Sequence, residues 1–453
     1  MTTIVAFVVV LGVLILVHEF GHFLVARLSG VGVERFSVGF GPVLWRYRGP
    51  QTEYCLSAFP LGGYVKMMGD DENPLEGGKS GEVDPARAFN NKPLPVRFLI
   101  VFAGPAMNAV LAVVIFALVF MLLGRPVVPA VVGRLTEGGP AIKAGFVTGD
   151  RIVAVAGRPV RYWEELLQAV QDQHGGTVQL TVKNERGERT LDVTPLRTSV
   201  RDLFGDERDV WDLGARPFTA PTIGEVLSGL PAERAGLRPG DTVVAIDGRP
   251  VHTWDEVAET IRQRAGQPTP LTIKRGTETL TVSVVPNAFT ERSPDGKTTE
   301  VGRIGISPTA PTTYVRSSPT VAIWDGVART AEVTELTAIG LYKIVRGQLE
   351  RSNIGGPIQI AVTAGEQARQ GLPSLAVFTA VISVNLFLLN LLPVPMLDGG
   401  HLLFFACEAV LGRPLSLRKR EVAQQIGFVL LMLLMVYAVY NDLDRIGLFR
   451  MFR

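Results

Sequence analysis

The sequence has little charge of either sign and almost no cysteine. Charged residues make up 19% of its 453 positions, below the roughly 25% that is usual in soluble globular proteins. The 45 basic and 43 acidic residues nearly cancel, so the basic excess of a nucleic-acid-binding protein is missing. With only Cys55 and Cys407, the chain cannot be a disulfide scaffold or a cysteine-rich zinc module.

Long apolar runs are what the sequence has instead. Hydrophobic residues make up 47% of the chain, and they gather in four runs near the ~20-residue length that crosses a bilayer. Met1-Thr2-Thr3 carries no charge and no clear cleavage site follows, which favours a retained membrane helix over a signal peptide. For the third and fourth runs the alternative is a buried helix of a soluble domain. The predicted spans are residues 4–27, 98–123, 374–395 and 424–441.

Basic residues in the short loops predict the orientation. Lys and Arg gather between the first and second spans and between the third and fourth, whereas none precedes the first span. Basic loops stay on the cytoplasmic side, so the long insert between the second and third spans lies on the other side. Cys55 and Cys407 then lie on the reducing side, and we expect no stable disulfide between them.

The long insert contains an internal repeat. AGFVTGDRIVAVAGRPVRYWEEL begins at Ala144, and AGLRPGDTVVAIDGRPVHTWDEV begins 91 residues later at Ala235. Each copy reads as a Gly-Asp turn, an apolar strand, a second turn and a short helix. Two copies at a fixed offset predict tandem small domains at residues 127–215 and 216–288. Residues 289–372 are expected to form a linker and an amphipathic helix at 319–347, lying on the membrane surface or packed under the repeats.

The first span contains the motif His18-Glu19-Phe20-Gly21-His22, which reads H-E-x-x-H. On a helix the two histidines share one face, so both imidazoles can reach one metal ion, and the glutamate can act on water at that ion. Ionisable groups inside a membrane are costly and usually functional. A catalytic metal site is therefore a better interpretation than a polar contact between helices.

Asp398 is the candidate third ligand. A catalytic zinc site has three protein ligands and one open position. Asp398 follows Pro393 and Pro395 and precedes two glycines at the end of the third span. A broken backbone at membrane depth is tolerated only where protein buries it or a cavity solvates it. His401 is a competing ligand.

These motifs together resemble the site-2 protease family (M50) of intramembrane zinc metalloproteases. HEFGH in the first span and NLLPVPMLDGG from Asn390 carry the resemblance. The order of spans, loop and inserted repeats is similar to the bacterial regulator-of-sigma-E type, which has tandem PDZ domains. Further similar segments are RFSVGFGP from Arg35, FPLGGYVKMMGD from Phe59, RAFNNKPLPVRF from Arg87 and AGPAMN from Ala103.

The resemblance implies a fold and a set of residue roles. The fold is a polytopic α-helical membrane protein with four transmembrane helices, a membrane-associated β-hairpin region at residues 30–70 and two inserted α+β PDZ domains. The membrane metalloprotease domain is split between residues 1–126 and 373–453. Zn²⁺ is the implied cofactor, with His18, His22 and Asp398 as ligands, Glu19 as general base, and Asn390 steadying the substrate or the oxyanion. The implied substrate-binding residues are Gly62, Gly63, Tyr64, Val65, Pro393 and Pro395.

The implied function is intramembrane endopeptidase activity on single-pass membrane proteins, such as anti-sigma-factor-like regulators or remnant signal peptides, in regulated intramembrane proteolysis. The implied location is the bacterial cytoplasmic (inner) membrane, with the PDZ domains extracytoplasmic and the active site toward the cytoplasmic leaflet. The partners are the substrates, the lipid bilayer and peptide C-termini at the PDZ domains, with no nucleic acid. One alternative to peptide binding is that the PDZ domains only pack against the membrane domain and bind nothing. Another is that they act as a size filter or gate, which excludes substrates with large outside domains until another protease trims them.

Two other classes of function compete with this interpretation. One is a membrane-anchored PDZ scaffold whose metal site is structural, closed by His401 as a fourth ligand. The other is a metal transporter, but the sequence lacks the paired inverted repeats of spans that such transporters have.

Overall fold

The four apolar runs become long helices, and the insert becomes strands and short helices. The computed structural model describes residues 2–69, 84–202, 204–292, 298–310, 312–348 and 355–445. The chain divides into two units, Met1–Arg125 with Arg316–Arg453, and Pro126–Val315. The first unit therefore joins both ends of the sequence, and the second is the insert.

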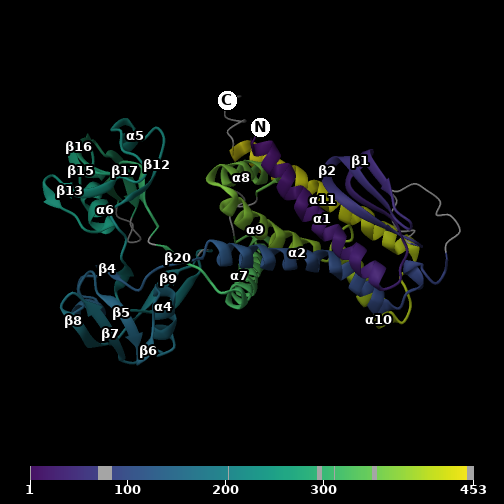
Figure 1. Ribbon diagram of the computed structural model, residues 1–453, viewed down its shortest axis with the longest axis horizontal. Helices are drawn as coiled ribbons and strands as arrows, with labels where there is room; N and C mark the ends of the chain where they lie inside the picture. Colours follow the sequence, from purple (N-terminus) through teal and green to yellow (C-terminus); the bar gives the residue numbers. More distant parts are fainter. Residues whose placement is uncertain are drawn as a thin grey trace. The chain divides into compact units, whose positions relative to one another are not determined.

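The first unit is helical apart from one sheet, with α1, α2, α9 and α11 long and apolar enough to cross a membrane (Figure 1). Large apolar side chains such as Val9 and Leu433 are more than half exposed on these helices, as expected where lipid covers them. Its elements are α1 (Thr2–Leu28), β1 (Val33–Arg48), β2 (Glu53–Met67), the 3₁₀ helix η1 (Phe89–Asn91), α2 (Leu94–Leu122), α7 (Pro319–Val345), α8 (Pro357–Gln370), α9 (Leu372–Asn390), α10 (Asp398–Leu411) and α11 (Leu417–Arg445). The short strand β3 (Arg125–Val127) begins at the last residue of the first segment and continues into the second unit.

Helix α2 lies at the centre of the first unit and contacts α1, α7, α9 and α10. Phe116 and Phe120 of α2 pack in one apolar cluster with residues of α7 and α9. At Gly326 of α7, an added Cβ would lie 2.8 Å from the Val113 carbonyl oxygen, so only glycine lets the two backbones approach this closely. The helix expected at 319–347 is thus α7, packed against α2 and α9.

Strands β1 and β2 form one bent hairpin beside α1. Residues 33–38 of β1 pair with residues 63–67 of β2 on one side and with residues 53–56 on the other. Residues 43–48 pair with 53–57. Residues 63–67 therefore form an edge, with β1 as their only strand partner among the described residues. The β-hairpin region expected at residues 30–70 is this hairpin, and residues 70–83 lie outside the described residues.

Some predicted limits in the first unit are wrong. The third span was placed at 374–395, but α9 ends at Asn390, because Pro393 and Pro395 lack the N–H that would continue the helix. The chain turns and then starts α10 at Asp398. Helices α8 and α10 were not predicted, and α11 begins seven residues before 424, at Leu417. Cys55 and Cys407 are both free, as expected.

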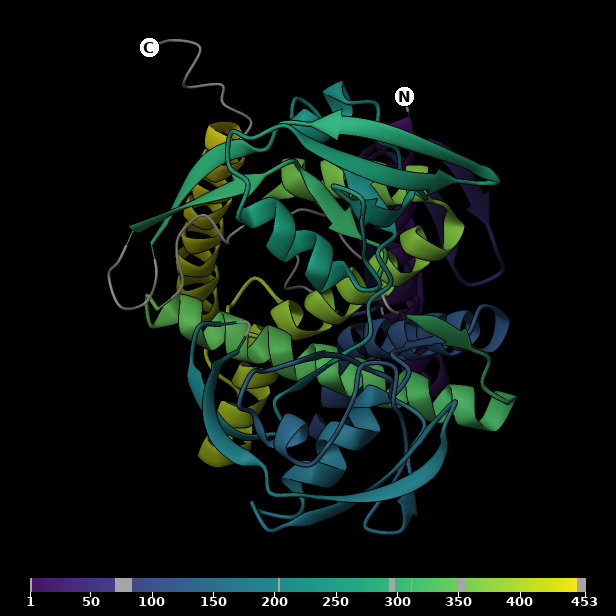
Figure 2. The same ribbon diagram turned by 90° about the vertical axis from the view of Figure 1, so that its left-hand side faces the viewer.

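The second unit consists of two copies of one arrangement of strands and helices. Each has a four-stranded antiparallel sheet, in the order β6-β5-β7-β8 or β14-β13-β15-β16. The longer helix of each copy, α4 or α6, packs on the sheet of that copy (Figure 2). The first copy contains β4 (Val132–Leu135), α3 (Pro140–Lys143), β5 (Arg151–Val155), β6 (Arg158–Pro159), α4 (Trp163–Gln171), β7 (Val178–Asn184), β8 (Gly187–Val193), β9 (Leu196–Arg201), β10 (Glu207–Asp212) and β11 (Ala215–Pro217).

Every element of the second copy begins 91 residues after its counterpart in the first. The pairing of β4 with β11 recurs as β12 with β19, which closes the second copy near Pro308. The limit predicted at 288 is therefore too early, and part of the expected linker belongs to this copy. Its elements are β12 (Ile223–Val226), α5 (Pro231–Arg234), β13 (Thr242–Ile246), β14 (Arg249–Pro250), α6 (Trp254–Arg262), β15 (Thr269–Arg275), β16 (Glu278–Val284), β17 (Asn287–Arg292), β18 (Thr298–Arg303) and β19 (Ile306–Pro308), and β20 (Thr313–Val315) then pairs with β3.

The Gly-Asp turn of each copy holds a buried carboxylate. Asp150 and Asp241 are 0% and 1% exposed. Asp241 accepts hydrogen bonds from Arg275 at 2.7 Å and from the Arg238 backbone N–H at 2.8 Å. Asp150 accepts one from Arg189 at 2.6 Å. The repeated aspartate is thus explained by an ion pair between its buried carboxylate and an arginine, which joins the turn to a strand of the same sheet.

Candidate metal centre

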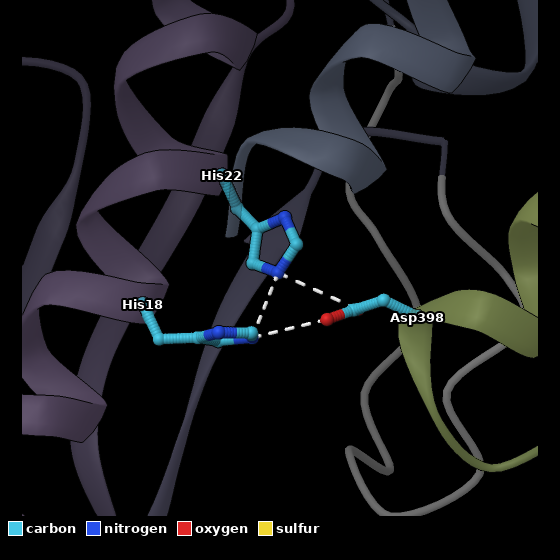
Figure 3. A group of neighbouring side chains, drawn as sticks. All are labelled: His18, His22 and Asp398. Atoms are coloured by element: carbon cyan, nitrogen blue, oxygen red, sulfur yellow. Dashed lines mark hydrogen bonds and ion pairs between the residues drawn. The ribbon is translucent and has the colours of Figure 1, made fainter. Parts of the chain in front are cut away.

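The two histidines of H-E-x-x-H lie one turn apart on α1 and turn their Nε2 atoms toward each other (Figure 3). The two Nε2 atoms are 3.3 Å apart. His22 is buried, and His18 is partly buried. The predicted helical spacing therefore brings both imidazoles to one point.

Asp398 points at this pair from α10, some 380 residues further along the chain. Its carboxylate oxygens lie 3.1 Å from His18 Nε2 and 3.5 Å from His22 Nε2. It is the first residue of α10, directly after the turn that contains Pro393 and Pro395. A Cβ on Gly399 would lie 2.2 Å from the Leu392 carbonyl oxygen, so the glycine lets α10 fold back tightly on this turn.

The three side chains fit a zinc ion. One donor atom from each of His18, His22 and Asp398 lies within 4.8 Å of the others. Two nitrogen ligands about 2.0–2.1 Å from a tetrahedral zinc ion are separated by about 3.3 Å, which matches the Nε2–Nε2 distance. His401 is not part of this group among the described residues, and its ring instead packs edge-on against Phe404. Three ligands leave one coordination position for water or substrate, as in catalytic zinc sites.

Helix α2 supports His22 from behind. His22 Nδ1 donates a hydrogen bond to the Ile100 carbonyl oxygen at 2.9 Å, which leaves Nε2 free to bind a metal ion. A Cβ on Gly104 would lie 2.2 Å from His22 Nε2, so the ring occupies space that any other residue would fill. Neither residue was predicted to have a role in the site, although Gly104 lies in the AGPAMN segment.

Two asparagine amides lie near Nδ1, the ring nitrogen of His18 that faces away from the metal centre. Asn390, predicted as a site residue, has its amide nitrogen 3.4 Å from His18 Nδ1. Asn108 lies at the same distance, from α2. Asn108 was quoted in the AGPAMN segment but was given no role. Its signal was an amide in the middle of an apolar span, where a polar side chain is costly.

Glu19 and the edge of the hairpin meet beside the metal centre. A Cβ on Gly63 would lie 2.7 Å from Glu19 Cγ and 2.8 Å from the Ser37 carbonyl oxygen, so β2 lies directly against the glutamate. Gly62, Gly63, Tyr64 and Val65, the predicted substrate-binding residues of β2, follow one another along this edge. The Tyr64 ring stacks on Phe40, and its hydroxyl accepts a hydrogen bond from Arg35 at 3.2 Å.

The two prolines predicted to bind substrate lie in the turn between α9 and α10. Pro395 packs against α10, where a Cβ on Gly400 would lie 2.4 Å from its Cα. It also lies against Gly427 of α11. Pro393 is exposed. The structure thus gives Pro395 a packing role in shaping the turn, and it leaves Pro393 accessible.

Comparison with known proteins identifies the family. Residues 6–434 match the model of peptidase family M50. The chain belongs to this family. A relative from Escherichia coli (strain K12), named regulator of sigma-E protease RseP, is 38% identical over 458 residues, covering 97% of this chain and 98% of that protein. Its Salmonella typhimurium counterpart is 38% identical over 456 residues, again covering 97% of this chain and 98% of the other.

A Vibrio cholerae protein named "Putative zinc metalloprotease" is 36% identical over 459 residues and covers 98% of both chains. This chain is therefore a metalloprotease, with zinc as its cofactor. Among solved structures, the PDZ domain of an SdrC-like protein from Listeria monocytogenes matches 20% of this chain and 90% of its own, at 20% identity and a TM-score of 0.16.

Proposed function

We propose that this M50 metalloprotease cleaves peptide bonds inside the membrane, with zinc held by His18, His22 and Asp398. The observation that carries the proposal is the convergence of these three side chains within one bundle of apolar helices. The candidate ligands lie on α1 and at the start of α10, next to helices apolar enough to cross a membrane, which supports a reaction at membrane depth. His401 lies outside this group, which supports an open catalytic site over a closed structural one.

A peptide bond in a transmembrane helix is already hydrogen-bonded, so the enzyme must first unwind it. Lipid offers no replacement hydrogen bonds for the freed backbone groups. The edge of β2 at residues 63–67 offers them, because an extended segment can add to a sheet as a further strand. Gly62, Gly63, Tyr64 and Val65 then hold the substrate backbone next to Glu19.

Glu19 and Asn390 are assigned the proton transfer and the positioning of substrate. Zinc, when bound, supplies the Lewis acidity that activates water and polarises a carbonyl group. The Glu19 carboxylate accepts the proton of the attacking water and delivers it to the amine that leaves. Asn390 ends α9 at the metal centre, where its amide can donate to the substrate carbonyl.

The proposed substrates are transmembrane segments of single-pass membrane proteins, including anti-sigma-factor-like regulators and remnant signal peptides. The names of the two RseP relatives, which refer to sigma-E regulation, support this class. The two copies of the second unit are proposed to be PDZ domains on the extracytoplasmic side of a bacterial inner membrane. The two basic loops, between the first and second spans and between the third and fourth, support this orientation, in which the metal centre lies toward the cytoplasmic leaflet.

The proposal is tested by comparing membrane proteomes of cells that express the wild-type protein or Glu19→Gln as their only copy. We expect a small set of single-pass proteins, or freed signal peptides, to accumulate uncut in the variant. Identical proteomes would contradict the proposed substrate class.

A further inference from the structure

Asn108 is a fully buried polar residue that the proposed reaction does not use. It lies in the middle of α2 and is 0% exposed. Its amide nitrogen is 3.4 Å from His18 Nδ1, and its amide oxygen has no hydrogen-bond partner among the described residues. A buried polar atom without a partner is destabilising, so an amide kept at this position needs a reason.

The reason for an amide at this position is Nδ1, the ring nitrogen of His18 that does not face the other two metal ligands. Its Nε2 faces His22 and Asp398. A neutral imidazole that binds a metal ion through Nε2 carries its proton on Nδ1, and this N–H needs an acceptor. An amide oxygen accepts the hydrogen bond, whereas an amide nitrogen cannot.

An asparagine amide turned by 180° fills nearly the same space with oxygen and nitrogen exchanged. In that orientation the Asn108 oxygen accepts the hydrogen bond from His18 Nδ1. We propose that Asn108 is a positioning residue that holds His18 in the tautomer and ring orientation needed to bind zinc. The inference rests on the proposed zinc site of His18, His22 and Asp398.

Burial and anchoring favour Asn108 over Asn390 for this role, although both amides lie 3.4 Å from His18 Nδ1. The Asn108 backbone carbonyl accepts a hydrogen bond from Ser383 Oγ at 2.7 Å, which ties this turn of α2 to α9. Asn390 is only partly buried and is the last residue of α9, next to the proline-containing turn. Asn108 therefore serves the histidine, and Asn390 remains available to the substrate.

The test measures zinc affinity by chelator competition on the full-length protein in detergent, alongside cleavage of a single-pass model substrate. Asn108→Leu removes the acceptor at similar volume, and we expect a zinc dissociation constant about 10–100-fold higher. Asn108→Asp keeps an acceptor oxygen, and we expect affinity near that of wild type. Asn390→Leu should lose cleavage while keeping zinc. Asn385→Leu is the matched control, because that amide bonds Thr337 instead of a metal ligand.

The outcomes separate this inference from the proposed function. Wild-type zinc affinity in Asn108→Leu would overturn the role of Asn108, and so would an Asn108→Asp variant as weak as Asn108→Leu, since both would indicate packing alone. If Asp398→Ala binds zinc as tightly as wild type, the proposed metal site fails instead. Melting temperatures of the zinc-free variants show whether a loss of zinc comes from unfolding.

Discussion

Close approach at single residues shapes the metal centre. Gly21 and Gly104 lie where α1 and α2 meet, and a Cβ on Gly21 would come within 2.3 Å of the Ala103 carbonyl oxygen. His22 then lies directly over Gly104, with its Nδ1 bonded to Ile100. The geometry of the metal ligands thus depends on two positions that have no side chain.

Gly104→Ala should weaken the metal site. The added methyl group would overlap the His22 ring, so the ring must move away from His18 and Asp398. We expect at least a 10-fold loss of zinc affinity and of cleavage, as for other changes next to metal ligands. Zinc content after dialysis and a cleavage assay measure it. Gly12→Ala, on α1 with no atom within 4 Å of the added Cβ, is the control and should behave as wild type. If Gly104→Ala and Gly12→Ala bind zinc equally well, Gly104 does not hold the His22 ring in its metal-binding position.

At the scale of elements, the sequence predicts those features that leave a periodic or repeated pattern. Four apolar runs, the H-E-x-x-H spacing and the break before Asp398 could all be predicted, because helix periodicity and proline act locally. Helices α8 and α10 could not be predicted, because the glycine and proline residues before them are equally typical of a turn. The end of the second copy was missed, although the 91-residue offset applied to β11 would have placed it at β19. The support of His18 and His22 by α2 depends on contacts between helices, which no local pattern contains.

The second copy of the insert should lose stability at acidic pH through Asp241. Hydrogen bonds from Arg275 hold the pKa of Asp241 below its ordinary value of 3.8, against the effect of burial. The folded state therefore favours the carboxylate, and this stabilisation is present above the ordinary pKa and is lost as the pH falls through the lower folded pKa. Hydrogen exchange of β13 and β15 in the full-length protein, corrected for intrinsic exchange rates, measures this loss of stability.

Arg275→Met should raise the hydrogen exchange rates of β13 and β15 already at pH 7. It should also remove most of the increase in those rates that acidic pH causes in the wild type. The matched control is Lys274→Met, which removes one positive charge from the same strand without touching Asp241. If both variants exchange alike, the buried ion pair does not stabilise this copy.

At the scale of the whole molecule, a membrane-embedded protease is interrupted by a separate unit. Strands β3 and β20 pair where the chain leaves and re-enters the first unit, so the two ends of the insert lie side by side. The three candidate metal ligands all belong to the first unit. The described residues of the insert contribute none of these candidate ligands. The proposed roles of the insert are peptide binding or exclusion of substrates with large extracytoplasmic domains.

Removing residues 128–312, with Val127 joined to Thr313 by a short flexible linker, tests whether the insert acts as a gate that excludes large substrates. If the insert excludes large substrates, the shortened protein should cut a full-length single-pass substrate that the wild type cuts only after trimming. Both proteins should cut the trimmed substrate at similar rates, which controls for loss of the active site. Unchanged selectivity would contradict the gate and leave peptide binding as its role.

In the proposed reaction, Glu19 acts on water at a zinc ion held by the two neighbouring histidines and Asp398. Zinc content and cleavage, measured together for Glu19→Gln in purified protein reconstituted with a single-pass substrate, test this role of Glu19. We predict about one zinc per chain, as in wild type, and a loss of cleavage of at least 100-fold, the low end of the range for a general base. Cleavage at the wild-type rate by zinc-loaded Glu19→Gln would contradict the role of Glu19 as general base.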